Sequence, residues 1–200
     1  MKSIIKTPLS SLLVIMGFLA SMPPALAETS IPASEIRIRD PFILPHRESG
    51  LYYMYAQRKN RDESLPNGVE VYWSEDLKHW AGPEPVFEVP DDFWATSMVW
   101  APEVHRYDEK FYLFVTFTPH GNNRGTQVLV SDSPRGPFKP FANKAHTPAD
   151  WQSLDGTLYV EEGQPYMVFC HEWLQVKDGT MELVKLTGDL SDVEGKPVTL

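Results

Sequence analysis

The strongest constraint on this chain is a unit that occurs three times along it. Each unit opens with a polar group, runs along an apolar strand, turns tightly, returns on an aromatic strand and continues into a third strand. The units begin near Asp40, Glu103 and Asp155, a period of about fifty to sixty residues, which is typical of the blades of a β-propeller. A β-sandwich is the alternative for the same strand content, and the repeat favours the propeller.

The remaining pattern is also that of an all-β protein. Short runs of Val, Tyr, Phe, Leu and Ile are interrupted by Gly, Pro, Asp and Asn, and few stretches have helical periodicity. We place the blades at about 36–90, 98–142 and 151–200. Propellers usually close with about 4–8 blades. We therefore expect the sequence to be a fragment, with a partial propeller over residues 28–200.

The N-terminus has the features of a secretory signal peptide. Lys2 and Lys6 precede an apolar run over residues 9–20, and Ala25-Leu26-Ala27 supplies the small-residue cleavage pattern. The run is shorter than the ~20 residues that a membrane span needs. We expect residues 1–27 to be removed, the protein to be secreted or periplasmic, and the mature chain not to insert into a membrane.

Charge and cysteine content restrict the ligands and the crosslinks. The net charge is −9, and removal of the predicted signal peptide makes it more negative. An acidic surface argues against nucleic acid as a partner, because phosphates require Lys and Arg. Uncharged sugar polymers are compatible with it. Cys170 is the only cysteine in the sequence, so we expect no intramolecular disulfide.

Three acidic residues near the starts of the repeated units indicate possible chemistry. We expect Asp40, Glu103 and Asp155 to occupy equivalent positions and to point at the propeller axis. Carboxylates gathered in one pocket raise each other's pKa values. Hydrolysis of a glycosidic bond needs two neighbouring carboxyl groups. One, as a carboxylate, activates water, and the other, as an acid, protonates the leaving oxygen. The alternatives are turn residues for the two Asp and a strand cap for Glu103.

Three motifs then resemble the blade openings of glycoside hydrolase family 43. They are Arg39-Asp40-Pro41-Phe42-Ile43, Trp100-Ala101-Pro102-Glu103-Val104 and Ser153-Leu154-Asp155-Gly156-Thr157-Leu158. The resemblance covers residues 36–190. It implies a five-bladed propeller and inverting hydrolysis of plant cell-wall polysaccharides or oligosaccharides that contain arabinose or xylose.

The resemblance also implies roles for individual residues. Asp40 matches the general base, and Asp155 matches the second Asp, which orients the acid and adjusts its pKa. Trp100 matches an aromatic side chain beside the sugar, where an indole can stack on an apolar sugar face. The family's general-acid Glu opens the following blade, which would lie beyond Leu200.

Other residues are weaker candidates. Glu172 is the one attractive substitute for the general acid within the chain, and an ion pair with a nearby Lys or Arg is the alternative role. His171 is a candidate donor of a hydrogen bond to a sugar hydroxyl, or else a buried structural histidine. Glu103 is a candidate for contact with substrate.

No cofactor is required by this chemistry. The family often holds a cation in its central channel, but no ligand set can be assigned here, so Ca²⁺ stays an open alternative and we assign no metal ligand. No phosphate-binding loop, zinc motif or Gly-x-Ser-x-Gly elbow is present. The competing functions are a sugar-binding propeller without catalysis and a fructan-hydrolysing relative. In the fructan hydrolases the Arg-Asp-Pro string lies in a later blade.

Overall fold

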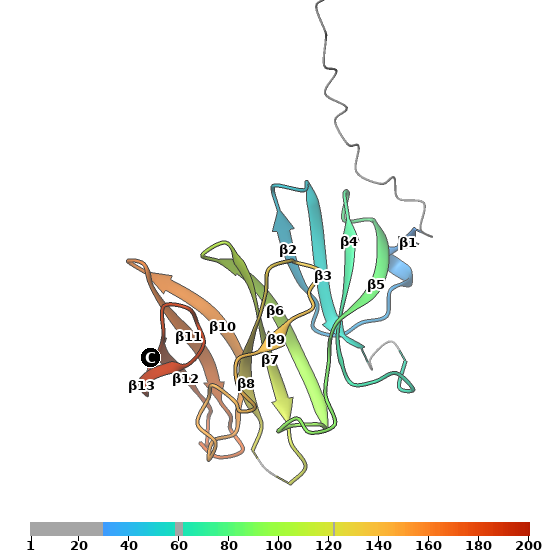
Figure 1. Ribbon diagram of the computed structural model, residues 1–200. Coiled ribbons are helices and arrows are strands. Elements are labelled where there is room, and N and C mark those ends of the chain that lie inside the picture. Colours follow the sequence, from blue (N-terminus) through green and yellow to red (C-terminus); the bar gives the residue numbers. More distant parts are fainter. Residues whose placement is uncertain (1–29, 59–61, 122) are drawn as a thin grey trace, which may run out of the picture.

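The computed structural model describes residues 30–58, 62–121 and 123–200. The predicted signal peptide, residues 1–27, lies outside the described residues. In the described part, three antiparallel sheets stand side by side (Figure 1), which confirms the all-β prediction. The described part contains a short 3₁₀ turn, η1 (Ala33–Glu35), and no helix in that part is long and apolar enough to cross a membrane.

Each sheet has the up-and-down strand order of a propeller blade. The first has the order β1-β5-β4-β3-β2, the second β6-β7-β8-β9 and the third β10-β11-β12-β13. The strands of the first are β1 (Ile31–Pro32), β2 (Phe42–His46), β3 (Leu51–Gln57), β4 (Gly68–Ser74) and β5 (His79–Glu88). The second contains β6 (Met98–Tyr107), β7 (Lys110–Thr118), β8 (Gly125–Ser131) and β9 (Lys139–Pro140). The third contains β10 (Ser153–Glu161), β11 (Gln164–His171), β12 (Thr180–Leu186) and β13 (Val193–Thr199).

The two larger hydrophobic cores lie between the sheets. Strand β7 is apolar at nearly every position because both of its faces are buried, and its side chains alternate between two partners. Phe111, Leu113 and Phe117 pack in a core shared with the first sheet. Tyr112 and Phe114 pack in a second core shared with the third sheet.

The first strand of each later sheet makes the contact with the sheet before it. Strand β6 packs against β2, β3 and β4, and β10 packs against β6, β7 and β8. The outer edges of the first two sheets are joined as well. The Phe138 N–H donates to the Val86 carbonyl at 2.8 Å, and the Tyr55 hydroxyl donates to the Pro134 carbonyl at 2.6 Å. These contacts fix the position of each first strand relative to the preceding sheet.

Gly156 marks the closest approach between the second and third sheets. A Cβ atom at this position would lie 2.6 Å from Thr126 Cγ2 and 2.9 Å from Met167 Sδ. A Cβ atom at these distances would clash with its neighbours. Strand β10 can therefore dock this closely only because Gly156 has no side chain.

Gly156→Ala should therefore destabilise the protein by about 1–3 kcal/mol, because the added methyl group forces β10 away from the second sheet. Urea unfolding with matched spectroscopic probes measures this change. Gly188→Ala is the control, since nothing lies within 4 Å of the Cβ position there. Equal stability of the two variants would contradict the proposed close approach.

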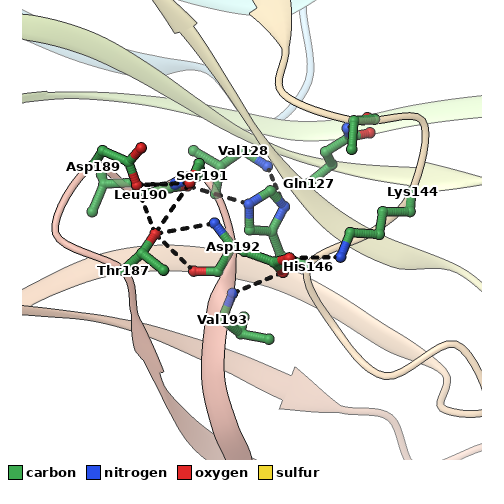
Figure 2. Close-up of polar contacts among 11 residues, drawn as sticks. Gln127, Val128, Lys144, His146, Thr187, Asp189, Leu190, Ser191, Asp192 and Val193 are labelled. Carbon is green, nitrogen blue, oxygen red and sulfur yellow. Dashed lines mark hydrogen bonds and ion pairs between the residues drawn. The ribbon is translucent and has the colours of Figure 1, made fainter.

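A buried histidine joins the second sheet to the third. Figure 2 shows the His146 imidazole between Val128 of β8 and Leu190, which precedes β13. The Val128 N–H donates to His146 Nδ1 at 3.2 Å, so Nε2 carries the proton and donates to the Leu190 carbonyl at 3.2 Å. Burial lowers the pKa of His146 and is the largest effect. The hydrogen bond to the Leu190 carbonyl and the charge of Asp192 partly oppose it, and Lys144 adds a smaller lowering effect.

This histidine should make stability depend on pH. The unfolded chain binds the proton at about pH 6.5, whereas the folded protein binds it only at lower pH. Stability is therefore complete above pH 6.5 and falls below it, by at most about 1.4 kcal/mol per pH unit for one proton. Urea unfolding at pH 7.5 and 5.5 measures the fall. His146→Gln should reduce it, and His120→Gln, at an exposed position, should not.

Candidate active site

The site is built on a backbone feature that recurs in all three sheets. Asp40, Ala101 and Asp155 have φ values of 49°, 42° and 54°, although none of them is glycine. Ala101 and Asp155 lie in bulges of β6 and β10, where two residues of the first strand have no partner on the second. Asp40 lies two residues before the first pair of β2 and β3. These strained positions turn the side chains out of the regular pleat.

The register corrects one expectation. Glu103 was predicted to be equivalent to Asp40 and Asp155, but Ala101 occupies that position. Glu103 is the first paired residue after the bulge, as Phe42 and Thr157 are in the other two sheets. The prediction was wrong by two residues because a bulge cannot be located from residue type alone.

The bulge that carries Asp155 is held by the second sheet. The Asp155 N–H donates to Thr116 Oγ1 at 3.0 Å, and the Gly156 N–H donates to Thr126 Oγ1 at 3.2 Å. Both threonines are buried, and they are directly paired between β7 and β8. Two backbone donors that β11 cannot satisfy are thus satisfied across the sheet interface, and the Asp155 side chain is aimed at solvent.

Other acidic residues act on Asp155 electrostatically. Partial burial raises the pKa of Asp155, and the negative charges of Asp40, Glu103 and Glu172 raise it further. Of these three, Asp40 has the largest effect. The Asp40 carboxylate is half exposed and lies 3.2 Å from Arg39 Nε. The two predicted catalytic Asp residues are therefore close enough for their charges to interact, as acid–base chemistry requires.

Glu103 is part of a hydrogen-bonded network between the second and third sheets. Its Oε2 lies 3.0 Å from His105 Nε2, which is also 3.3 Å from Thr157 Oγ1. Burial alone would raise the pKa of Glu103, but hydrogen bonds from His105 and Thr157 outweigh it and hold the pKa below its usual value. The His105 ring contacts Phe42 at a centroid distance of 5.2 Å, so the network adjoins all three first strands.

Glu172 and Trp100 meet through an arginine that the sequence analysis did not single out. Glu172 is buried, and its Oε1 accepts a hydrogen bond from Arg124 Nη1 at 3.1 Å. The Arg124 guanidinium lies over the Trp100 ring, 4.6 Å from its centroid. The ion-pair alternative for Glu172 is thus present. Arg124 could not be assigned from sequence, because an isolated Arg in a loop carries no pattern.

His171 is already engaged within the protein. Its ring stacks on Trp151 at 4.0 Å between centroids and 10° between planes, and its Nε2 lies 2.9 Å from Gln175 Oε1. The same Gln175 side chain binds the Gln152 N–H and the Asp150 carbonyl. In this structure the contacts of His171 are therefore those of a buried structural histidine.

The described residues do not supply a metal site. No group of three or more His, Cys, Asp or Glu side chains in residues 30–58, 62–121 and 123–200 is arranged to hold an ion.

Propeller-type sheets whose first strands carry carboxylates that interact are typical of glycoside hydrolases, because cleavage of a glycosidic bond needs a base and an acid in one site. The family model for glycosyl hydrolases family 43 matches residues 29–200, and the chain belongs to this family.

Its relatives include enzymes named for arabinan. The crystal structure of the endo-arabinase from Bacteroides thetaiotaomicron VPI-5482 matches with a TM-score of 0.77 and 43% identity, over 86% of this chain and 58% of that chain. The extracellular endo-alpha-(1->5)-L-arabinanase 1 of Bacillus subtilis (strain 168) is 23% identical, over 65% of this chain and 44% of the relative. The extracellular exo-alpha-(1->5)-L-arabinofuranosidase of Cellvibrio japonicus (strain Ueda107) is 22% identical, over 88% and 51%. The chain spans about half the length of the curated relatives it matches.

The electrostatic coupling between the two Asp residues can be measured directly. Asp40→Asn should lower the pKa of Asp155. The substitution removes the negative charge that has the largest effect on this pKa, and the burial of Asp155 is unchanged. Titration of the Asp155 carboxyl carbon by NMR gives the pKa. Asp132→Asn, at a side chain that is 92% exposed on the second sheet, is the control. An unchanged Asp155 pKa in the Asp40 variant would show that the two carboxylates are not coupled.

Proposed function

We propose that this protein hydrolyses arabinan at internal linkages, with Asp40 as the general base. The observation that carries the proposal is the 43% identity to an endo-arabinase whose fold matches over most of this chain. The grouping of Asp40 and Asp155 at equivalent backbone positions supports it, since both sheets present a carboxylate at the same end of the first strand. The names of the curated relatives, which refer to α-1,5-linked arabinose, agree with this substrate.

The roles follow from the environment of each group. Asp40 is half exposed, so water can reach it, and it would take a proton from the water that attacks the anomeric carbon. Inversion requires the base and the acid to lie ~6.5–9.5 Å apart, which leaves room for that water. Asp155, among other carboxylates, would orient the proton donor and adjust its pKa. Trp100, which is partly exposed, would stack on a sugar ring.

We assign no proton donor among the described residues. Glu172 is the candidate that the sequence suggested, but one of its oxygens is engaged by Arg124 in a buried ion pair. The Arg124 contact favours a positioning role for Glu172 over proton donation.

We also propose that the protein is exported. The signal-peptide pattern of residues 1–27 and the extracellular relatives support this location. N-terminal sequencing of protein recovered outside the cytoplasm should find Glu28 as the first residue. Recovery of the protein only from the cytoplasm, with chains that still begin at Met1, would contradict export.

Asp40→Asn in the full-length protein should lower kcat on linear arabinan by about a hundredfold or more while oligosaccharide binding is retained, because the base is lost but the site keeps its shape. Reducing-sugar release measures kcat, and calorimetry measures binding. Asp132→Asn is the control for removal of an exposed carboxylate. Retention of more than about a tenth of the activity would exclude Asp40 as the base.

The substrates used in this assay also separate the alternatives. Release from arabinan with short oligosaccharides as first products supports internal attack, and release of arabinose alone indicates terminal attack. A preference for arabinoxylan or for fructan would show that arabinan is not the preferred substrate. Binding of arabinan without release by the wild-type protein would favour the sugar-binding alternative over an enzyme.

A further inference from the structure

A cluster of largely buried side chains lies where the second and third sheets meet. Trp100 of β6, Arg124 before β8 and Glu172 after β11 come from three separate segments. The guanidinium lies 4.6 Å from the centroid of the indole and 3.1 Å from the Glu172 carboxylate. Trp100 is directly paired with Thr116, one of the two threonines that hold the Asp155 bulge.

The Arg124–Glu172 pair is not a surface ion pair. The two side chains are 18% and 11% exposed, and both Arg124 Nε and Glu172 Oε2 are buried without a hydrogen-bond partner in the protein. Burial of two charges with incomplete hydrogen bonding is costly, and the mutual attraction only partly offsets that cost. Such a pair adds little to stability, and its best-attested use is to fix one geometry.

The backbone around the pair is fixed on both sides. The Arg124 N–H donates to Gln152 Oε1 at 3.2 Å, and the Arg124 carbonyl accepts from the Ser153 N–H at 3.0 Å. The Glu172 N–H donates to the Gln152 carbonyl at 2.8 Å. The guanidinium can therefore move little, and the plane that it presents to Trp100 is determined by the junction of the two sheets.

We propose that Arg124, held by Glu172, is a positioning residue that sets the plane of the Trp100 indole, so that an arabinose unit of the substrate stacks on the opposite face. This inference rests on the proposed function for its substrate. Arg124 covers one face of the ring, which excludes sugar and solvent from that face. A planar guanidinium can do this and a lysine ammonium cannot, because only the guanidinium stacks over its full area.

The test compares Arg124→Met, Arg124→Lys and Glu172→Gln in the full-length protein, with Arg47→Met, at an exposed position in the turn after β2, as the matched control. KM for linear arabinan should rise about fivefold or more in Arg124→Met, and kcat should stay within about threefold, because stacking contributes to binding rather than to bond cleavage. Arg124→Lys keeps the charge opposite Glu172 and should also raise KM, because the ammonium group does not cover the indole face. This variant replaces Arg124→Met in the test if the Met variant does not fold.

A second substitution shows whether Arg124 acts through the indole. In a Trp100→Ala background, Arg124→Met should have no further effect on arabino-oligosaccharide affinity, because its target is gone. A further loss of the same size in that background would overturn the proposal and mean that Arg124 contacts substrate itself.

The leaving group separates positioning from acid catalysis at Glu172. If Glu172 only positions Arg124, Glu172→Gln lowers kcat/KM by the same factor on arabinan and on nitrophenyl arabinofuranoside. If Glu172 donates the proton, arabinan hydrolysis falls far more than nitrophenyl release, since nitrophenolate leaves without protonation. The second result would overturn the positioning role.

One readout does not depend on arabinan. The fluorescence contribution of Trp100, obtained by subtracting the spectrum of Trp100→Phe in each background, should change in Arg124→Met and stay unchanged in Arg47→Met. A wild-type protein that neither binds nor cleaves arabinan would reject the proposed substrate, and this fluorescence change would still support the positioning of Trp100. An unchanged contribution in Arg124→Met would reject the positioning itself.

Discussion

The arrangement of the site depends on two backbone hydrogen bonds between sheets, from the N–H groups of Asp155 and Gly156 to the buried hydroxyls of Thr116 and Thr126. The bulge in β10 leaves these donors without partners on β11, and buried donors must be satisfied. Because the threonines belong to the neighbouring sheet, the same two bonds satisfy the bulge, fix the distance between the sheets and orient Asp155. Gly156 is required because no side chain fits between these groups.

The electrostatics of the site follow from this close docking. Three first strands that approach one another bring Asp40, Glu103 and Asp155 into a small region, where each negative charge disfavours ionisation of Asp155. Hydrogen bonds from His105 and Thr157 hold the pKa of Glu103 below its usual value against the effect of burial, and Glu172 pairs with Arg124. Asp155 is anchored through its backbone and has no cationic partner among the described contacts, and partial burial together with the neighbouring carboxylates raises its pKa. Different partners thus give neighbouring carboxylates different protonation behaviour.

The sequence predicted the strands and the sheet class because period-two alternation and turn residues act locally. It also selected Asp40 and Asp155, whose neighbours Pro41 and Gly156 are informative about backbone shape. It misplaced Glu103, since nothing local reveals that Ala101 takes a positive φ. Arg124 and Thr116 could not be found, because their partners are 48 and 39 residues away in the chain and depend on how the sheets dock.

The alternation of β7 has a consequence for recombination. Its odd-numbered aromatic and aliphatic side chains complete one core and its even-numbered ones complete another, so neither of these two cores belongs to a single sheet. A sheet moved alone into another propeller would carry two half-cores and would need matching halves on both sides. Recombination between propellers should therefore exchange whole interfaces, each made of the facing halves of two adjacent sheets. Crossover points within a sheet would disturb packing less than crossover points between sheets.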